Sequence, residues 1–105
     1  MEQPNLLYVN QLSGEDEAFK NRLISIIKTE FPQEKAVYEK NIAAKNYTEA
    51  AENVHKLKHK ISILGLEKSF EVAVNFEEHL LEKETDGQTE FEAILQCITN
   101  YLSTI

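Results

Sequence analysis

The chain has 105 residues, 42% of them hydrophobic, and a formal net charge of −7, which suits one soluble domain spanning residues 1–105. The negative charge disfavours a nucleic-acid partner, because phosphate binding needs a basic surface. Cys97 is the only cysteine, so the chain can form no internal disulfide, as is usual in a reducing cytoplasm. Neither a long apolar stretch nor a signal sequence is present, so we expect a cytoplasmic protein without a membrane span.

The first part of the chain predicts a short lead-in followed by a long helix. Residues Asn5–Val9 are apolar but too few for an independent element, and we expect them to cover one end of the core. The run Ser13–Asp16 resembles a helix-capping signal, and apolar residues follow it at helical spacing. Pro32 removes an amide donor and clashes with the preceding turn, so a kink or a break is expected at Glu30–Phe31. Helical composition resumes over Gln33–Lys45, and the positions expected to be buried there are Val37, Tyr38 and Ile42.

A central helix is predicted from Thr48, which could serve as its N-cap, to Leu64. Gly65 follows, where a left-handed residue would end the helix. One face gathers the apolar residues and is predicted to be buried: Ala50, Val54, Leu57, Ile61 and Leu64. A second stripe is predicted to point away from the core: Ala51, His55, Lys58 and Ser62.

Two more helices complete the prediction, one from Leu66 to about Glu84 and one from Thr89 to about Ser103, with a turn at Thr85–Gly87. Their apolar faces comprise Phe70, Ala73, Val74, Leu80 and Leu81, and Phe91, Ile94, Leu95, Ile98 and Leu102. No strand-like alternation persists, and short connections between long helices favour antiparallel neighbours. The predicted fold is all-α: an antiparallel up-down four-helix bundle with a short N-terminal lead-in and a kinked first main helix.

His55 lies in a basic stretch of an otherwise acidic chain. A surface histidine often has no role, but Lys58, one turn on, could neutralise an anion on the ring. Glu77 falls within an apolar arc, where an unpaired carboxylate is costly. A hairpin turning at Gly65 would bring Glu77 beside His55, where it could accept a hydrogen bond from Nδ1–H and leave Nε2 as a nucleophile. A salt bridge from Glu77 to a neighbouring lysine is the alternative.

Other candidate chemistries are less well supported. His55 and His59 stand at i and i+4, a spacing that can chelate a metal ion, and Glu52 could lend an oxygen. Nothing completes that set, so we predict no metal site. His79 is expected at the edge of the core without a role, and Cys97 as a small residue in a similar place. Glycine-rich phosphate loops, Gly-x-Ser-x-Gly and HExxH motifs are absent, which disfavours nucleotide hydrolysis, serine hydrolysis and zincin chemistry.

One run of residues resembles the signature of a known family. His55-Lys56-Leu57-Lys58, followed after the intervening residues by Leu64-Gly65, is similar to the motif of histidine-containing phosphotransfer (HPt) domains: H-x-L-K-G, four residues, then L-G. Phe76-Glu77 falls where that family has a hydrophobic residue followed by Glu or Gln. The resemblance covers essentially the whole chain, since HPt domains are antiparallel helical bundles of about this length.

The resemblance implies a phosphorelay carrier that is not itself an enzyme. His55 would take a phosphoryl group from the aspartate of a receiver domain, or from a sensor kinase, and pass it to another receiver. Lys58 would stabilise the phosphoryl charge and Glu77 would orient the ring. The expected partners are response-regulator receivers and hybrid histidine kinases, with the chain acting as a monomer. Mg²⁺ would be bound by the receiver, and no cofactor by this chain.

The chain departs from the family where His59 replaces the glycine after the lysine. A bulky residue there could hinder a partner, add a second cation near the phosphoryl group, or swing aside. Docking is expected on the exposed face around His55. The predicted partner contacts are Leu6, Leu7, Ala51, His59 and Ser62. Two alternatives stay open: a helical adaptor that binds a partner without being phosphorylated, and a small metal-binding bundle.

Overall fold

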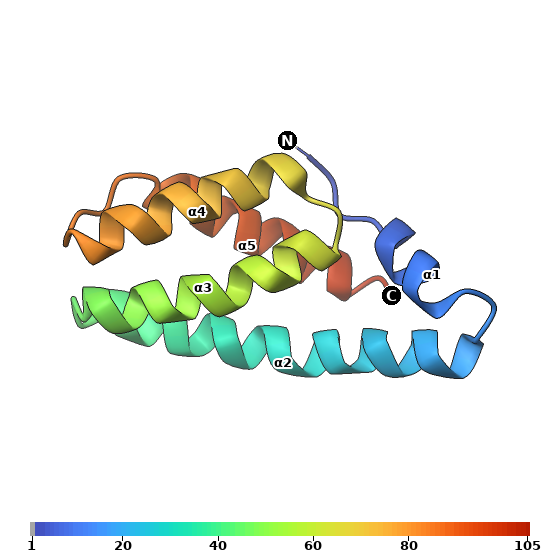
Figure 1. Ribbon diagram of the computed structural model, residues 1–105. Coiled ribbons are helices and arrows are strands. Elements are labelled where there is room, and N and C mark those ends of the chain that lie inside the picture. The colour runs from blue at the N-terminus through green and yellow to red at the C-terminus, as the bar shows by residue number, and fades with distance from the viewer. Residues whose placement is uncertain (1) are drawn as a thin grey trace.

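The computed structural model describes residues 2–105 and is entirely helical over that range, with five helices and no strand (Figure 1). The helices are α1 (Leu7–Ser13), α2 (Glu17–Ala43), α3 (Tyr47–Ile63), α4 (Glu67–Leu81) and α5 (Gln88–Leu102). The molecule is elongated, 45 × 23 × 19 Å, and the four longer helices lie along its long direction. Within the described range, none of the helices has the length and apolar content that crossing a membrane requires. The all-helical prediction is confirmed.

Helix α3 lies between two neighbours, because it packs against both α2 and α4. Helix α5 packs against α4 and α2, which closes the bundle around one interior. The short helix α1 packs against α2, at the end of the molecule where α3 passes into α4 (Figure 1). The predicted lead-in is therefore a helix of its own that covers one end of the bundle, and it begins later than expected.

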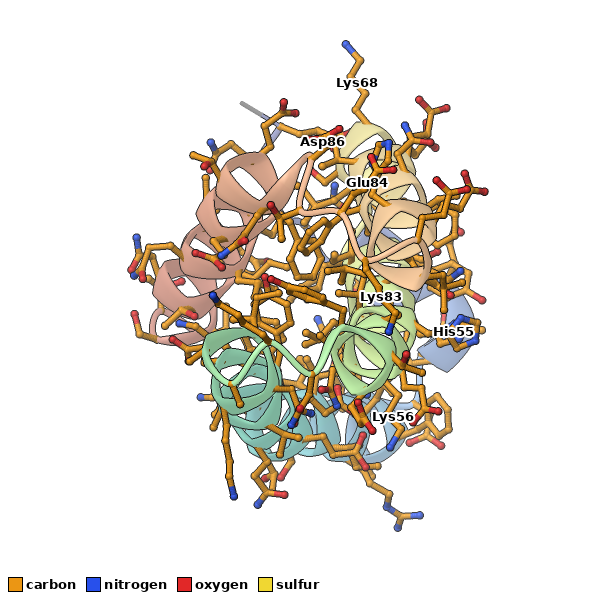
Figure 2. The ribbon with its side chains drawn as sticks, turned by 90° about the vertical axis from the view of Figure 1, so that its left-hand side faces the viewer. His55, Lys56, Lys68, Lys83, Glu84 and Asp86 are labelled. Carbon is orange, nitrogen blue, oxygen red and sulfur yellow. The ribbon has the colours of Figure 1, made fainter. Side chains whose placement is uncertain are left out.

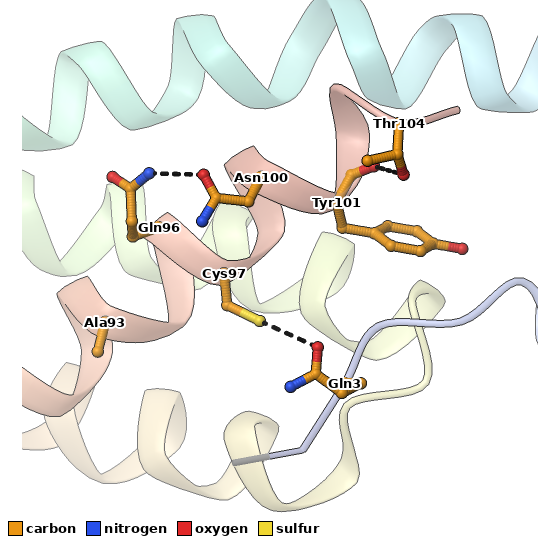
Figure 3. Close-up of a pocket in the computed structure, with 7 residues that line it drawn as sticks. All are labelled: Gln3, Ala93, Gln96, Cys97, Asn100, Tyr101 and Thr104. Atoms are coloured by element: carbon orange, nitrogen blue, oxygen red, sulfur yellow. Dashed lines mark hydrogen bonds between the residues drawn. The ribbon is translucent and has the colours of Figure 1, made fainter.

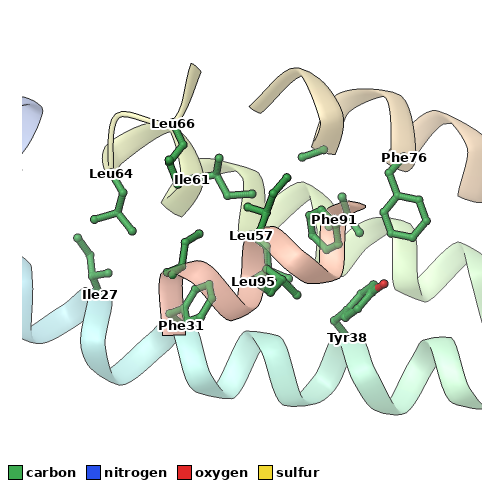
Figure 4. Packing of buried hydrophobic residues seen from close by; sticks show 14 of the residues in the cluster. Ile27, Phe31, Tyr38, Leu57, Ile61, Leu64, Leu66, Phe76, Phe91 and Leu95 are labelled. Carbon is green, nitrogen blue, oxygen red and sulfur yellow. The ribbon is translucent and has the colours of Figure 1, made fainter. Parts of the chain in front are cut away.

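One apolar core runs through the interior of the bundle (Figure 4). The predicted inner faces of α3 and α5 are both confirmed, because every residue assigned to them is buried. The main core side chains are Val9 from α1; Ile27, Phe31 and Tyr38 from α2; Ala50, Val54, Leu57 and Ile61 from α3; Ala73, Phe76 and Leu80 from α4; and Phe91, Ile94, Leu95, Ile98 and Leu102 from α5. Helical periodicity alone was enough to find most of them.

Tyr38 is the centre of an aromatic cluster in this core. Its ring meets those of Phe91 and Phe76 edge-on, at centroid distances of 5.3 and 6.3 Å. The Tyr38 hydroxyl donates a hydrogen bond to Glu92 Oε2 at 3.0 Å. Burial, followed by the negative charge of Glu92, raises the pKa of Tyr38 well above its ordinary value of 10.0. The tyrosine is therefore held in its neutral form.

Helix α2 corrects two predictions. It was expected to kink or break at Glu30–Phe31. It runs unbroken through Pro32, so a break is wrong, and Figure 1 shows no sharp bend that would correspond to the expected kink. Pro32 lies on the exposed side, where water can satisfy the carbonyl group that loses its donor, while the packing of Phe31 and Tyr38 holds the helix on both sides of it. Val37 is 48% exposed instead of buried, because it lies about 100° around the helix from Tyr38.

Two further corrections concern α3 and α4. Helix α3 begins at Tyr47 with Asn46 as its N-cap residue, so the expected cap at Thr48 is wrong. On α4 Phe76 is fully buried although it was not part of the predicted arc, whereas Leu81, which was, is 58% exposed. The sequence of α4 is apolar on more than one side, and packing against both α3 and α5 selects a face rotated from the predicted arc.

The turn between α3 and α4 is a Schellman motif. Gly65 has φ +77°, as predicted, and the N–H of Leu66 donates to the carbonyl of Ile61 at 3.2 Å. A Cβ at Gly65 would lie 2.6 Å from the Asn5 side-chain nitrogen, and the N–H of Asn5 donates to Leu64 O at 2.9 Å. The N-terminal segment thus fastens the turn that sets α4 beside α3.

Carboxylates cap two of the helices. The Asp16 side chain accepts a hydrogen bond from Phe19 N–H at 3.0 Å, which confirms the capping signal in the sequence. The Glu2 carboxylate accepts the N–H groups of Lys68 and Ser69 at the start of α4, both at 2.9 Å. Burial acts to raise the pKa of Glu2, but the hydrogen bonds from Lys68 and Ser69, together with the charge of Lys68, outweigh it, so the pKa lies below its ordinary value of 4.5.

Candidate functional site

Helix α3 presents His55 to solvent because its opposite face is buried. Val54, directly before His55, and Leu57, two residues after it, are fully buried, which directs the imidazole outward. The side chain of His55 is 54% exposed, and Figure 2 shows it projecting from the side of the bundle. The prediction that His55 faces solvent is confirmed.

Glu77 of α4 lies beside His55, as the hairpin geometry predicted. His55 Nδ1 lies 3.1 Å from Glu77 Oε2, so Nδ1–H donates a hydrogen bond to the carboxylate. No side chain among residues 2–105 is bonded to Nε2, the other ring nitrogen. A hydrogen bond of this kind fixes the tautomer with its proton on Nδ1 and leaves a lone pair on Nε2, directed away from Glu77.

Lys58 completes a cluster of three side chains. Its Nζ lies 3.0 Å from Glu77 Oε1, so the carboxylate contacts the lysine with one oxygen and the histidine with the other. Lys58 also lies over the ring of Phe70, with Nζ 5.9 Å from the ring centroid. Both interpretations of Glu77 from the sequence, a bond to His55 and a salt bridge to a lysine, therefore hold together. Lys58 is largely screened from solvent, so its positive charge is held next to His55.

His59 lies one turn along α3 and is exposed. Its ring meets that of His55 edge-on, with centroids 5.2 Å apart and an angle of 88° between the planes. The residue that departs from the HPt signature is thus in direct contact with the candidate acceptor. Its ring occupies space next to the imidazole that a glycine would leave open.

A shallow hollow of about 330 Å³ adjoins His55 on the side toward the start of α3. Its lining comprises Thr48, Ala51, Glu52, His55, Lys56, Glu77 and Leu81. The prediction that Ala51 points to solvent is wrong, since its side chain is 2% exposed and lies within this lining. A methyl group is small enough to be covered by neighbouring side chains, while exposed Leu81 supplies the apolar area that Ala51 was expected to offer. Leu81 was predicted on the buried face of its helix and was not among the expected partner contacts.

The other predicted partner contacts lie farther along α3. Ser62 is exposed and lies seven residues after His55, which is roughly 10 Å along the helix. Leu7 is 68% exposed on α1, while Leu6 is half-buried and packs against the core. Figure 1 shows α1 at the end of the bundle where α3 ends. The structure therefore separates the predicted contacts into a set near the hollow and a set near α1.

Another hollow, of about 630 Å³, lies along α5 (Figure 3). Its lining comprises Gln3, Ala93, Gln96, Cys97, Asn100, Tyr101 and Thr104. Gln96 donates a hydrogen bond to Asn100 at 2.9 Å, and Cys97 Sγ lies 4.0 Å from Gln3 Oε1. Half-buried Cys97 sits at the edge of the core, as expected. The lining assembles neither a charged cluster nor a nucleophile with a base, so we assign the candidate site to His55.

Among residues 2–105, the groups that could hold a metal ion do not include His55 or His59. The one group of three ligand-type side chains in this range is His79, Glu84 and Asp86, around the end of α4. The predicted alternative of a site built on the His55–His59 pair thus gains no third ligand. Comparison of the chain with protein-family models, with curated proteins and with solved structures finds no match in any of the three.

Proposed function

We propose that the chain is a phosphocarrier of a phosphorelay, with His55 as the residue that accepts and donates the phosphoryl group. The arrangement of His55, Glu77 and Lys58 is the observation that supports the proposal. Two facts of the fold agree with it. Short connections join α2, α3, α4 and α5, as in an up-down antiparallel four-helix bundle of the HPt type, and α4 lies beside α3.

The chemistry requires little from this chain beyond a positioned nucleophile. The lone pair of His55 Nε2 attacks the phosphorus of an aspartyl phosphate. A nitrogen–phosphorus bond forms while the phosphorus–oxygen bond to the aspartate breaks, and the carboxylate leaves with the electron pair. The ring then carries a positive charge, which the Glu77 carboxylate stabilises through the hydrogen bond that it accepts from Nδ1–H. Transfer to the next receiver reverses these steps.

Lys58 has two roles in this scheme. In the structure its ammonium group neutralises Glu77, so the carboxylate is not left unpaired beside an apolar face. Once a phosphoryl group is on Nε2, Lys58 lies one turn away and supplies the nearest fixed positive charge to its oxygens. Because Lys58 is already held by Glu77 and Phe70, little side-chain entropy is lost in positioning it.

The partner that suits this face is acidic. Lys56 and His59 are exposed beside His55 on a chain of net charge −7, and a receiver domain presents a carboxylate-rich pocket that holds Mg²⁺. Receiver domains and their kinases work in the cytoplasm, which is where we place this chain. We propose that it acts there as a monomer that holds no nucleotide, and no cofactor at the His55 site, since the partner supplies the metal for transfer and most of the stabilisation of the transition state.

A second function is favoured by one observation, the contact of His59 with the His55 ring. A side chain in that position could exclude the receiver, and the chain would then be a helical adaptor that binds a signalling partner without phosphorylation. The two functions differ in whether His55 ever carries a phosphoryl group.

The deciding experiment is transfer from a radiolabelled phosphorylated receiver domain in the presence of Mg²⁺. We expect label on this chain that is stable in base and labile in acid. The His55→Gln variant should carry none, and His59→Ala should keep it. Label that persists in His55→Gln would overturn the carrier assignment, and a wild-type chain that binds the receiver without label would favour the adaptor.

A further inference from the structure

His79 lies outside the candidate phosphoryl site, on the last full turn of α4. Its Nδ1 is shut off from solvent and has no hydrogen-bond partner among residues 2–105. A buried polar nitrogen without a partner costs free energy, so it calls for a ligand that the protein itself does not provide.

Two carboxylates converge on this histidine. One ligand-type atom from each of His79, Glu84 and Asp86 lies within 4.8 Å of the other two. None of these side chains forms a hydrogen bond or an ion pair, either with another of the three or with any other described residue. Two carboxylates held close together without a cation repel each other. Ligand atoms within 4.8 Å of one another are close enough for one metal ion to contact all three after small side-chain shifts.

The backbone explains why the three side chains meet. Helix α4 ends in a Schellman motif, in which Lys83 has φ +61° and the N–H of Glu84 donates to His79 O at 2.8 Å. This hydrogen bond folds Glu84 back over His79, where such motifs usually place an apolar contact. Asp86 lies in the following turn, directly before Gly87. Gly87 is the N-cap residue of α5 and has φ +94°.

The surroundings favour a cation. His79 and Asp86 line a hollow of about 210 Å³, and Asn75 and Glu90 in the same lining offer further oxygen atoms. The neighbouring Lys83 does not neutralise the two carboxylates. Figure 2 shows Glu84 and Asp86 together on the α4–α5 loop, with the Lys83 side chain extending away from them.

We propose that His79, Glu84 and Asp86 bind a divalent transition-metal cation of the zinc class. Zn²⁺ accepts one imidazole with carboxylate oxygens at bond lengths of about 2.0 to 2.2 Å, which separates neighbouring ligand atoms by roughly 3 to 4 Å. Small side-chain rotations bring the observed spacing into that range, because both carboxylates are on exposed loop positions. The imidazole selects against Mg²⁺ and Ca²⁺, which prefer oxygen ligands alone. The ion would tie the end of α4 to the loop that leads into α5.

The site is tested by titrating Zn²⁺ into the full chain, previously stripped with a chelator, by calorimetry at neutral pH. We expect one binding event and a rise in melting temperature, because an ion bound only by the folded state stabilises it. In His79→Gln, and in the double variant Glu84→Gln with Asp86→Asn, the affinity for Zn²⁺ should fall at least tenfold. The rise in melting temperature should shrink accordingly. Mg²⁺ should give no heat under the same conditions.

Two control variants make the result specific. Glu78→Gln removes an exposed carboxylate next to His79 on α4, and His59→Ala removes the histidine that could pair with His55; both should bind Zn²⁺ as the wild type does. The proposal is overturned by absence of heat in the wild type, by unchanged affinity in the double carboxylate variant, or by loss of binding only in His59→Ala. The double variant changes exposed side chains, so it keeps the test decisive if His79→Gln does not fold.

Discussion

The chain places two histidines on neighbouring helices in opposite electrostatic surroundings. His55 on α3 is half-exposed, is flanked by lysines, and has its Nδ1 bonded to Glu77. His79 on α4 is flanked by Glu84 and Asp86, and its Nδ1 is buried without a partner. The two proposals therefore assign the same imidazole to an anion in one place and to a cation in the other. The lesson is that the neighbours, more than the ring itself, determine which chemistry a histidine can perform.

Both surroundings depend on a Schellman turn at a helix end. The turn at Gly65 sets α4 beside α3 and so brings Glu77 to His55. The turn at Lys83 folds Glu84 over His79 within a single helix end. The first turn sets the relative position of residues ten positions before it and twelve after it, whereas the second acts on its immediate neighbours. Perturbing the first should therefore affect His55 and leave His79 intact.

The largest effect that separates the two regions is expected from Gly65→Ala. Alanine in a left-handed conformation costs about 1 to 2 kcal/mol. The new Cβ would also displace Asn5, whose Oδ1 accepts the N–H of Leu7 at 3.0 Å. The free energy of unfolding should fall by about 2 to 3 kcal/mol in total. Denaturant titration measures this change, and phosphoryl transfer should weaken while zinc binding persists.

Gly87→Ala is the matched control for this prediction. Gly87 also has a positive φ, but a Cβ there would meet Phe76 only at ordinary contact distances, the nearest being 3.6 Å. It should show the conformational cost without the clash. Equal losses of stability in the two variants would mean that the contact with Asn5 carries no weight. A double-mutant cycle of Gly65→Ala with Asn5→Ala is a second test: if the two effects on stability add, the contact with Asn5 carries no weight.

Glu77→Gln is expected to have a smaller effect, confined to the His55 region. The amide keeps the shape of the carboxylate but not its charge, so the charged ring of the phosphorylated state loses about 1.5 kcal/mol, or roughly tenfold in transfer rate. Nitrogen NMR of the imidazole gives a second readout, because the tautomer with its proton on Nδ1 should no longer dominate. Glu78→Gln, on the same helix and exposed, should change neither quantity. If the tautomer of His55 is unchanged in Glu77→Gln, Glu77 does not position the ring.

The sequence could predict the His55 region because regular helices transmit position reliably. Every residue of α3 rises by the same amount, so the distances from Gly65 back to His55 and forward to Glu77 determine that they meet. The buried face of α3 follows from the same regularity. The burial of Ala51 could not be read in this way, because it depends on how closely neighbouring side chains cover a small residue on the flank of the helix.

The His79 region escaped prediction for a different physical reason. Its geometry depends on a left-handed residue at Lys83, and a lysine gives no signal for that conformation, as a glycine does at Gly65. Without that turn, Glu84 and Asp86 look like ordinary loop carboxylates. Helix α2 gave the opposite error at Pro32, where tertiary packing kept a helix that local rules would interrupt.

The smallest effect is expected from Tyr38→Phe, which tests whether the two regions share one core without sharing chemistry. Tyr38 packs on Phe76, which precedes Glu77 and lies three residues before His79. At neutral pH the variant loses one hydrogen bond to Glu92, at a cost of about 1 kcal/mol.

Because the folded pKa of Tyr38 is raised, its contribution to stability is complete below the ordinary value of 10.0 and is lost as pH rises above it. Denaturant midpoints between neutral and strongly alkaline pH should therefore fall more steeply for the wild type than for Tyr38→Phe. Tyr8→Phe, at an exposed position, should follow the wild type. Parallel curves for wild type and Tyr38→Phe would mean that Tyr38 ionises freely and that the aromatic cluster is open to water.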